Sequence, residues 1–160
     1  MTSSLASLDL GYNEFTEIPI EALRNLKVLN WLNLQNNYIS DLDPKMDWGG
    51  LTESLTSLSL SNNHICVLRE DTLSSLRHLV QLELDGNRLR QIDAGALPPS
   101  LALLRLSDNL LSDLPCKALM LLPRLRHLHL RNNVLQPMSN TSCRSERSKI
   151  DSLDLSHNEL

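Results

Sequence analysis

The chain has 160 residues, of which 41% are hydrophobic, 21% charged and only 3% aromatic, and its formal net charge is -4 at pH 7. This mildly acidic balance argues against nucleic acid as the main partner, because phosphate binding needs a basic face. No apolar run approaches the roughly 18 residues that would span a bilayer, and residues 1–4 show neither the basic nor the apolar region of a signal peptide.

One pattern, Leu-x-x-Leu-x-Leu-x-x-Asn-x-Leu, organises the whole chain. Its clearest copy covers residues 79–89, and further copies begin near residues 5, 29, 55, 101, 125 and 150. The fixed asparagines are 22 to 26 residues apart, and a fixed period of this length is typical of a solenoid, in which each unit packs only on its neighbours.

Each copy contains a short strand. Its Leu-x-Leu step has a period of two, so the two leucines face the core and the residue between them faces solvent. The core pairs are Leu8/Leu10, Leu32/Leu34, Leu58/Leu60, Leu82/Leu84, Leu104/Leu106, Leu128/Leu130 and Leu153/Leu155. An asparagine amide after each strand can satisfy backbone groups that the turn leaves unpaired. We expect these asparagines to form a structural ladder: Asn13, Asn37, Asn63, Asn87, Asn109, Asn133 and Asn158.

The return segments repeat more loosely. They are too short for long helices, so we expect turns, extended stretches or single helical turns, with Ala22–Leu26 and Thr72–Leu76 as the best short-helix candidates. The second return is enlarged and carries Trp48, which is expected to cover the convex side, whereas the sixth return, residues 139–149, is polar.

The domain organisation follows from the repeats. We interpret residues 1–160 as a single array of about seven units. Neither end has a cysteine cluster or a polar terminal repeat, which a solenoid needs to shield its last leucines. We therefore interpret the chain as uncapped at both ends and as a fragment of a longer array.

The motif resembles the leucine-rich repeat superfamily in its typical 24-residue subtype, with Leu114-Pro115 in the Leu-Pro position. Leucines replace the phenylalanine of the subtype at Leu23, Leu73, Leu97 and Leu119. The resemblance implies a leucine-rich repeat solenoid, an arc of the α/β horseshoe type. Parallel strands would line its concave face, and turns, 3-10 turns or one-turn helices its convex face. This subtype is common in chaoptin-like, Slit-like and Toll-like extracellular proteins that bind other proteins.

The outward strand positions should form columns across the concave face. The central column is expected to read Asp9, Asn33, Ser59, Glu83, Arg105, His129 and Asp154, and the column before it Ser7, Trp31, Ser57, Gln81, Leu103, His127 and Ser152. We predict that a protein partner binds this face through Tyr12, Trp31, Glu83, Asp85, Arg105, His127, His129 and Arg131.

Trp31 is the first candidate on this face. Interfaces are enriched in tryptophan, and an outward-facing tryptophan has no packing role in the core. The other interpretation, a single exposed aromatic ring that leans on its neighbours, stays open. Glu83 and Arg105 lie on adjacent strands in register, so they are expected to pair with each other on a solvated face.

A metal site is the main chemical alternative. His127 and His129 share one face of a strand, and Asp154 on the next strand offers a carboxylate. Arg105 and Arg131 flank the pair and would repel a cation. We therefore expect no metal, no cofactor and no catalytic residue, since no nucleophile and base are brought into a pocket that the sequence defines.

Two features bear on the cellular compartment. Asn140-Thr141-Ser142 is the only glycosylation sequon. Cys116 and Cys143 lie in neighbouring returns, but their registers differ by three residues, so we expect free thiols. The leading prediction is a non-enzymatic interaction module of an extracellular or cell-surface protein in adhesion or ligand recognition. The alternative is an intracellular adaptor or regulatory subunit in the cytoplasm.

Overall fold

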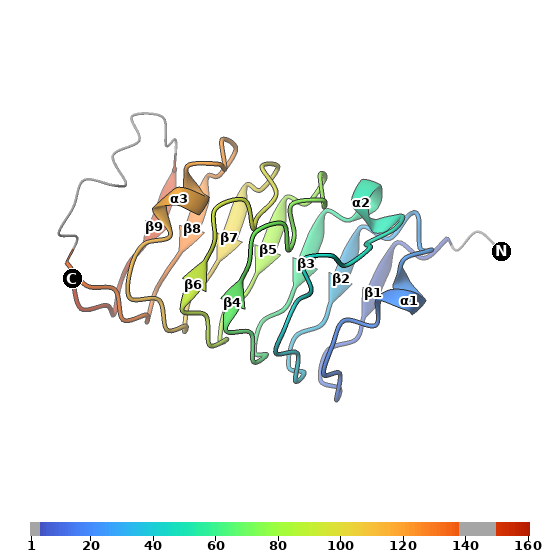
Figure 1. The fold of residues 1–160 in the computed structure, drawn as a ribbon, viewed down its shortest axis with the longest axis horizontal. Helices are drawn as coiled ribbons and strands as arrows, with labels where there is room; N and C mark the ends of the chain where they lie inside the picture. Colours follow the sequence, from blue (N-terminus) through green and yellow to red (C-terminus); the bar gives the residue numbers. More distant parts are fainter. Residues whose placement is uncertain (1–3, 138–149) are drawn as a thin grey trace.

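The computed structural model describes residues 4–137 and 150–160. The chain winds into a solenoid in which one parallel sheet lines one side (Figure 1). The strands follow one another in the order β1 (Ser7–Asp9), β2 (Trp31–Asn33), β3 (Ser57–Ser59), β5 (Gln81–Glu83), β7 (Leu103–Arg105), β8 (His127–His129) and β9 (Ser152–Asp154). The predicted fold class, a leucine-rich repeat solenoid with a parallel concave sheet, is confirmed.

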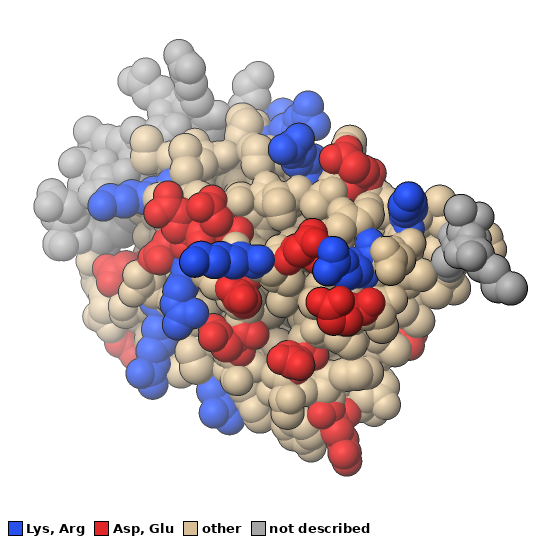
Figure 2. Space-filling view, turned by 45° about the vertical axis from the view of Figure 1, so that its right-hand side comes forward, with Lys and Arg blue, Asp and Glu red and all other residues tan. Residues whose placement is uncertain are grey.

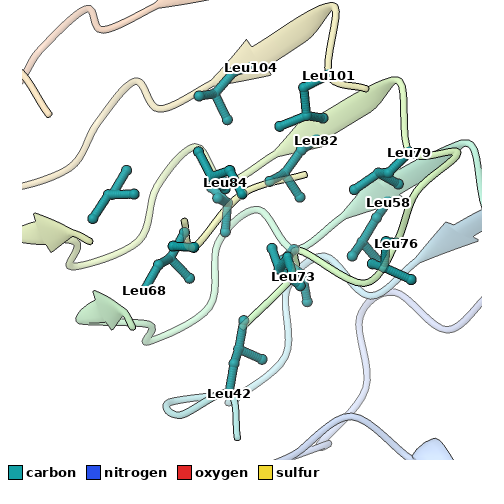
Figure 3. Close-up of a cluster of buried hydrophobic side chains, with 14 of the residues drawn as sticks. Leu42, Leu58, Leu68, Leu73, Leu76, Leu79, Leu82, Leu84, Leu101 and Leu104 are labelled. Atoms are coloured by element: carbon teal, nitrogen blue, oxygen red, sulfur yellow. The ribbon is translucent and has the colours of Figure 1, made fainter. Parts of the chain in front are cut away.

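Leucines fill the interior between the strands and the returns. The middle residue of every strand pairs with the middle residue of the next, so that Leu32, Leu58 and Leu82 stack in one row. Leu58 and Leu82 are fully buried, and the close-up shows them pointing into the same cluster as Leu73 and Leu76 of the return (Figure 3). In these strands the period of two has the orientation that the sequence predicts, whereas Leu153 of the last strand, which was also predicted to face the core, is 51% exposed.

The turn after each strand is left-handed. The residue before every ladder asparagine has a positive φ, a conformation that costs about 1–2 kcal/mol for most residues; these residues are Tyr12, Asn36, Asn62, Gly86, Asp108, Asn132 and His157. Asparagine, aspartate and glycine tolerate it best. The sequence pattern does not reveal this feature, because residue types other than these occupy two of the positions, Tyr12 and His157.

The asparagines link neighbouring repeats. Asn87 Nδ2 donates to the carbonyl oxygens of Leu60 at 2.9 Å and Leu84 at 3.0 Å, and Asn87 Oδ1 accepts the N–H of Ile65 at 3.0 Å. Asn37, Asn63, Asn109 and Asn133 make the same cross-repeat bonds. Each amide therefore satisfies backbone groups of two repeats at once.

The convex side is built from short elements. Among the described residues it holds three one-turn helices, α1 (Ile20–Leu23), α2 (Leu51–Ser54) and α3 (Cys116–Leu119), and a small parallel sheet of β4 (Val67–Leu68) and β6 (Gln91–Ile92). The helix expected at Thr72–Leu76 is absent, because that segment forms turns. Trp48 is 2% exposed, so the enlarged second return buries its indole in the core.

The expectation of free thiols is wrong for Cys116, which is disulfide-bonded, whereas Cys66 is free and exposed. The expectation rests on counting positions after the ladder asparagine, and this count does not fix which way the thiol of Cys116, the first residue of helix α3, points. Cys143 and the sequon at Asn140 lie outside the described residues.

Candidate functional site

The strand register creates the predicted columns on the concave face. Asp9 pairs with Asn33, Asn33 with Ser59, and Ser59 with Glu83. Glu83 then pairs with Arg105, followed by His129 and Asp154. Residues more than 140 positions apart in the chain are thereby arranged on one continuous sheet, and each outward side chain has a fixed neighbour on either side.

A shallow hollow opens on this face beside Trp31. Its volume is about 190 Å³, and the Trp31 side is partly open to solvent, since this residue is 36% exposed. The hollow is lined by residues of three adjacent repeats: Trp31, Asn33, Gln35, Ser57, Ser59, Gln81 and Glu83. The indole of Trp31 therefore lies at the edge of a polar recess. Its role as a binding residue stays a prediction.

Two lining residues carry unused hydrogen-bonding capacity. Ser59 is 7% exposed, and its Oγ has no hydrogen-bond partner. Glu83 is half-buried, and among the ion pairs of residues 4–137 and 150–160 none includes its carboxylate. A buried polar atom without a partner is uncommon and needs an explanation.

The expected pair between Glu83 and Arg105 is not formed. Arg105 Nε instead donates to Asp85 Oδ2 at 2.6 Å, and Asp85 Oδ1 accepts the N–H of Ser107 at 2.7 Å. The hydrogen bond to Asp85 raises the pKa of the Arg105 guanidinium above its ordinary value. Asp85 lies just past the end of its strand, where one carboxylate oxygen bonds Arg105 and the other accepts the backbone N–H of Ser107, at the turn after the next strand.

The histidine pair lies on one strand, next to the strand of Arg105. His127 is exposed and His129 half-buried, both on β8, and Asp154 stands beside His129 on β9. The hydroxyl and the backbone N–H of Ser156 lower the pKa of Asp154, and the nearby Arg131 and His129 add to the effect. Within the part of the chain that the structure describes, no group of three or more metal-ligating side chains is assembled.

Aromatic residues also lie at the turn edge of the sheet. Tyr12 is 76% exposed, and it occupies the left-handed turn position rather than the strand face to which the sequence assigned it. Tyr38 contacts His64 with ring centroids 5.7 Å apart. This pair is not among the predicted site residues. Both residues directly follow a ladder asparagine, so the repeat register could have revealed their contact.

Charges of both signs are interspersed on the surface. Figure 2 shows Lys and Arg side chains among Asp and Glu side chains on the face in view, without an extended field of one sign. In residues 4–137 and 150–160, no helix is long and apolar enough to cross a membrane.

Comparisons with known proteins agree with this architecture. The family model described as "Leucine rich repeat" matches residues 3–51, 53–98 and 82–135. Mouse (Mus musculus) podocan is 30% identical to the chain over 84% of the chain and 26% of podocan. Bovine (Bos taurus) osteomodulin is 30% identical over 100% of the chain and 32% of osteomodulin. The chain thus spans about a quarter to a third of the length of these relatives.

Solved structures share the solenoid. The Drosophila Toll–Spätzle complex matches with a TM-score of 0.79 and 28% identity, over 95% of this chain and 22% of that one. A complex of TLR13 with single-stranded RNA matches with a TM-score of 0.74 over 92% of this chain and 25% of that one, but at 23% identity this likeness shows the fold alone. The exclusion of nucleic acid as a partner, drawn from composition, stays a prediction.

The structure has seven strands in register with an asparagine after each of them, and the family model matches most of the sequence. The chain belongs to the leucine-rich repeat family.

Proposed function

We propose that this chain is a non-enzymatic protein-binding module whose concave face contacts the partner. The observation that carries the proposal is the continuous outward surface of seven strands, which sets Trp31 and its polar recess among charged residues of both signs. Such a surface fits protein recognition, because interfaces combine a buried aromatic anchor with a polar rim.

We further propose that the module belongs to an extracellular or cell-surface protein that acts in adhesion or ligand recognition. The disulfide at Cys116 supports this compartment, because disulfides persist in oxidising environments. The repeats are of the type common in extracellular proteins, and the matching Toll–Spätzle structure is of a glycosylated protein bound to a protein ligand.

The second candidate is an intracellular adaptor. The exposed free thiol of Cys66 favours it, because unpaired exposed cysteines are common in reducing compartments and uncommon in secreted proteins. The disulfide at Cys116 opposes it.

The test uses the purified chain as a probe on two arrays, one of extracellular ectodomains and one of cytosolic proteins. The proposal predicts binders on the extracellular array, with an affinity that falls at least about tenfold in Trp31→Ala, as for a hot-spot residue. Val80→Ala is the matched control, since Val80 is also exposed but precedes its strand. Binders found only on the cytosolic array would favour the adaptor, and binding unaffected by Trp31→Ala would contradict the concave site.

A further inference from the structure

The recess beside Trp31 has a specific chemistry. It combines an aromatic face, a single charged side chain, Glu83, and hydroxyl and amide groups that line the floor. Neutral polar side chains make up the remainder of the lining, so the carboxylate of Glu83 sets the sign of its electrostatic potential.

The carboxylate of Glu83 forms no ion pair among the described residues, although it lies near enough to Arg105 to help raise the pKa of that guanidinium. Arg105 faces it across the strands, but this arginine is held by Asp85 at 2.6 Å. The half-buried carboxylate therefore offers acceptor oxygens on the side of the hollow. A cation placed there would form a charge-assisted hydrogen bond, which is stronger than a neutral one.

Ser59 adds a second unmet requirement. Its side chain lines the hollow between Trp31 and Glu83 in strand order, and the buried Oγ lacks a partner. A χ1 rotation of Ser59 would turn this oxygen toward the hollow, where a ligand with several N–H donors would satisfy it as an acceptor.

We propose that this recess binds an arginine side chain of the protein ligand. The planar guanidinium stacks on the indole of Trp31, since arginine combines cation–π attraction with a flat shape. Its fork of N–H donors reaches the carboxylate of Glu83 and the Oγ of Ser59 together. The inference rests on the proposed protein-binding function and names the ligand group that the recess selects.

The test uses a small probe, Nα-acetyl-L-arginine amide, with the whole chain labelled at its two tryptophan indoles. The indole N–H signal of Trp31 should shift saturably in NMR titration, whereas the signal of Trp48, which is buried in the core, serves as the internal reference. The neutral isostere Nα-acetyl-L-citrulline amide should bind at least about tenfold more weakly, because it lacks the charge that Glu83 recognises.

Two variants separate this site from a general charge effect. Glu83→Gln should weaken binding of the arginine probe by about tenfold, whereas Glu14→Gln removes the same charge at an exposed position outside the strands and should leave binding unchanged. Equal shifts with the citrulline probe, or a stronger response to a neutral methyl glucoside, would overturn the proposal. The absence of any saturable shift in the natural chain would overturn it as well.

The outcome is distinguishable from a failure of the proposed function. A protein ligand that loses affinity in Trp31→Ala but not in Glu83→Gln would retain the concave binding face and overturn the arginine site. Conversely, saturable binding of the arginine probe without any ligand that depends on the concave face would retain the recess and contradict its role in protein binding.

Discussion

Asp85, and not the opposing Glu83, holds Arg105, with Arg105 Nε and Asp85 Oδ2 2.6 Å apart. The same Asp85 carboxylate accepts the backbone N–H of Ser107. Asp85, which follows strand β5, thus holds both the arginine of the next strand and the backbone at the start of the turn after that strand. The consequence for the concave face is that Glu83 keeps its charge available toward the recess beside Trp31.

Asp85→Asn tests this division of roles. The amide keeps an acceptor for Ser107 but loses the charge, so we expect a small loss of stability, about 0–1 kcal/mol as for exposed ion pairs. Arg105 should then turn toward Glu83 and weaken the arginine probe several-fold. The measurement is urea unfolding together with the NMR titration. An unchanged probe affinity would show that Asp85 does not govern access to Glu83.

Asn87→Ala tests the asparagine ladder. The change removes three hydrogen bonds, two of which cross to the previous repeat, and leaves buried backbone groups unpaired, so the free energy of unfolding should fall by about 3 kcal/mol. Asn13 is the control, because it is exposed and, among the described residues, its amide donates to Leu10 and Gly11 of its own turn. Asn13→Ala should cost less than about 1 kcal/mol. Equal losses in the two variants would contradict the ladder's structural role.

Gly49→Ala tests the close contact between the first two returns. Gly49 has φ +53°, and an added Cβ would lie 2.5 Å from the backbone oxygen of Arg24. Gly95 also has a positive φ, but its nearest atom would be 3.6 Å away. Gly95→Ala should therefore cost about 1 kcal/mol for the left-handed backbone, and Gly49→Ala about 1–3 kcal/mol more for the clash. Thermal unfolding measures both, and similar values would exclude the clash.

Ser156→Ala tests the origin of the low pKa of Asp154. The pKa of Asp154 is lower in the folded state than its ordinary value of 3.8, so the charged carboxylate contributes its full stabilisation above pH 3.8. This contribution is lost as the pH falls through the folded-state pKa. Loss of the Ser156 hydroxyl should raise the pKa toward 3.8. An NMR titration of the Asp154 carboxyl carbon measures it, with Ser152→Ala as the control. No rise in Ser156→Ala would assign the shift to other groups.

The repeat pattern predicts the regular part of the molecule well. Leu58 and Leu82 are buried, and Trp31 and Ser57 lie side by side, because the period of two and the parallel register follow from the spacing alone. The columns of the candidate site were therefore predictable by residue number. The hollow itself was not, because its depth depends on the small side chains of Ser57 and Ser59 next to a large indole.

The sequence pattern fails where a side chain can reach more than one partner. Register places Glu83 opposite Arg105, but side-chain length allows Arg105 to reach Asp85. The sequence also does not predict the disulfide at Cys116, nor that the segment from Thr72, which contains helix-forming leucines, forms turns. Tyr12 lies outside the strand because β1 ends at Asp9 and Tyr12 itself occupies the left-handed turn position.

A glycan placed on the concave face tests the central claim most directly. Ser57→Asn makes a sequon with Ser59 on the strand face, and Lys27→Thr makes one at Asn25, which is exposed outside the strands. Both chains are produced by secretion from mammalian cells, and the affinity for a ligand identified on the array is measured. The glycan at position 57 should abolish binding while the glycan at Asn25 preserves it. Retained affinity with the glycan at position 57, or loss only with the glycan at Asn25, would contradict binding by the concave face.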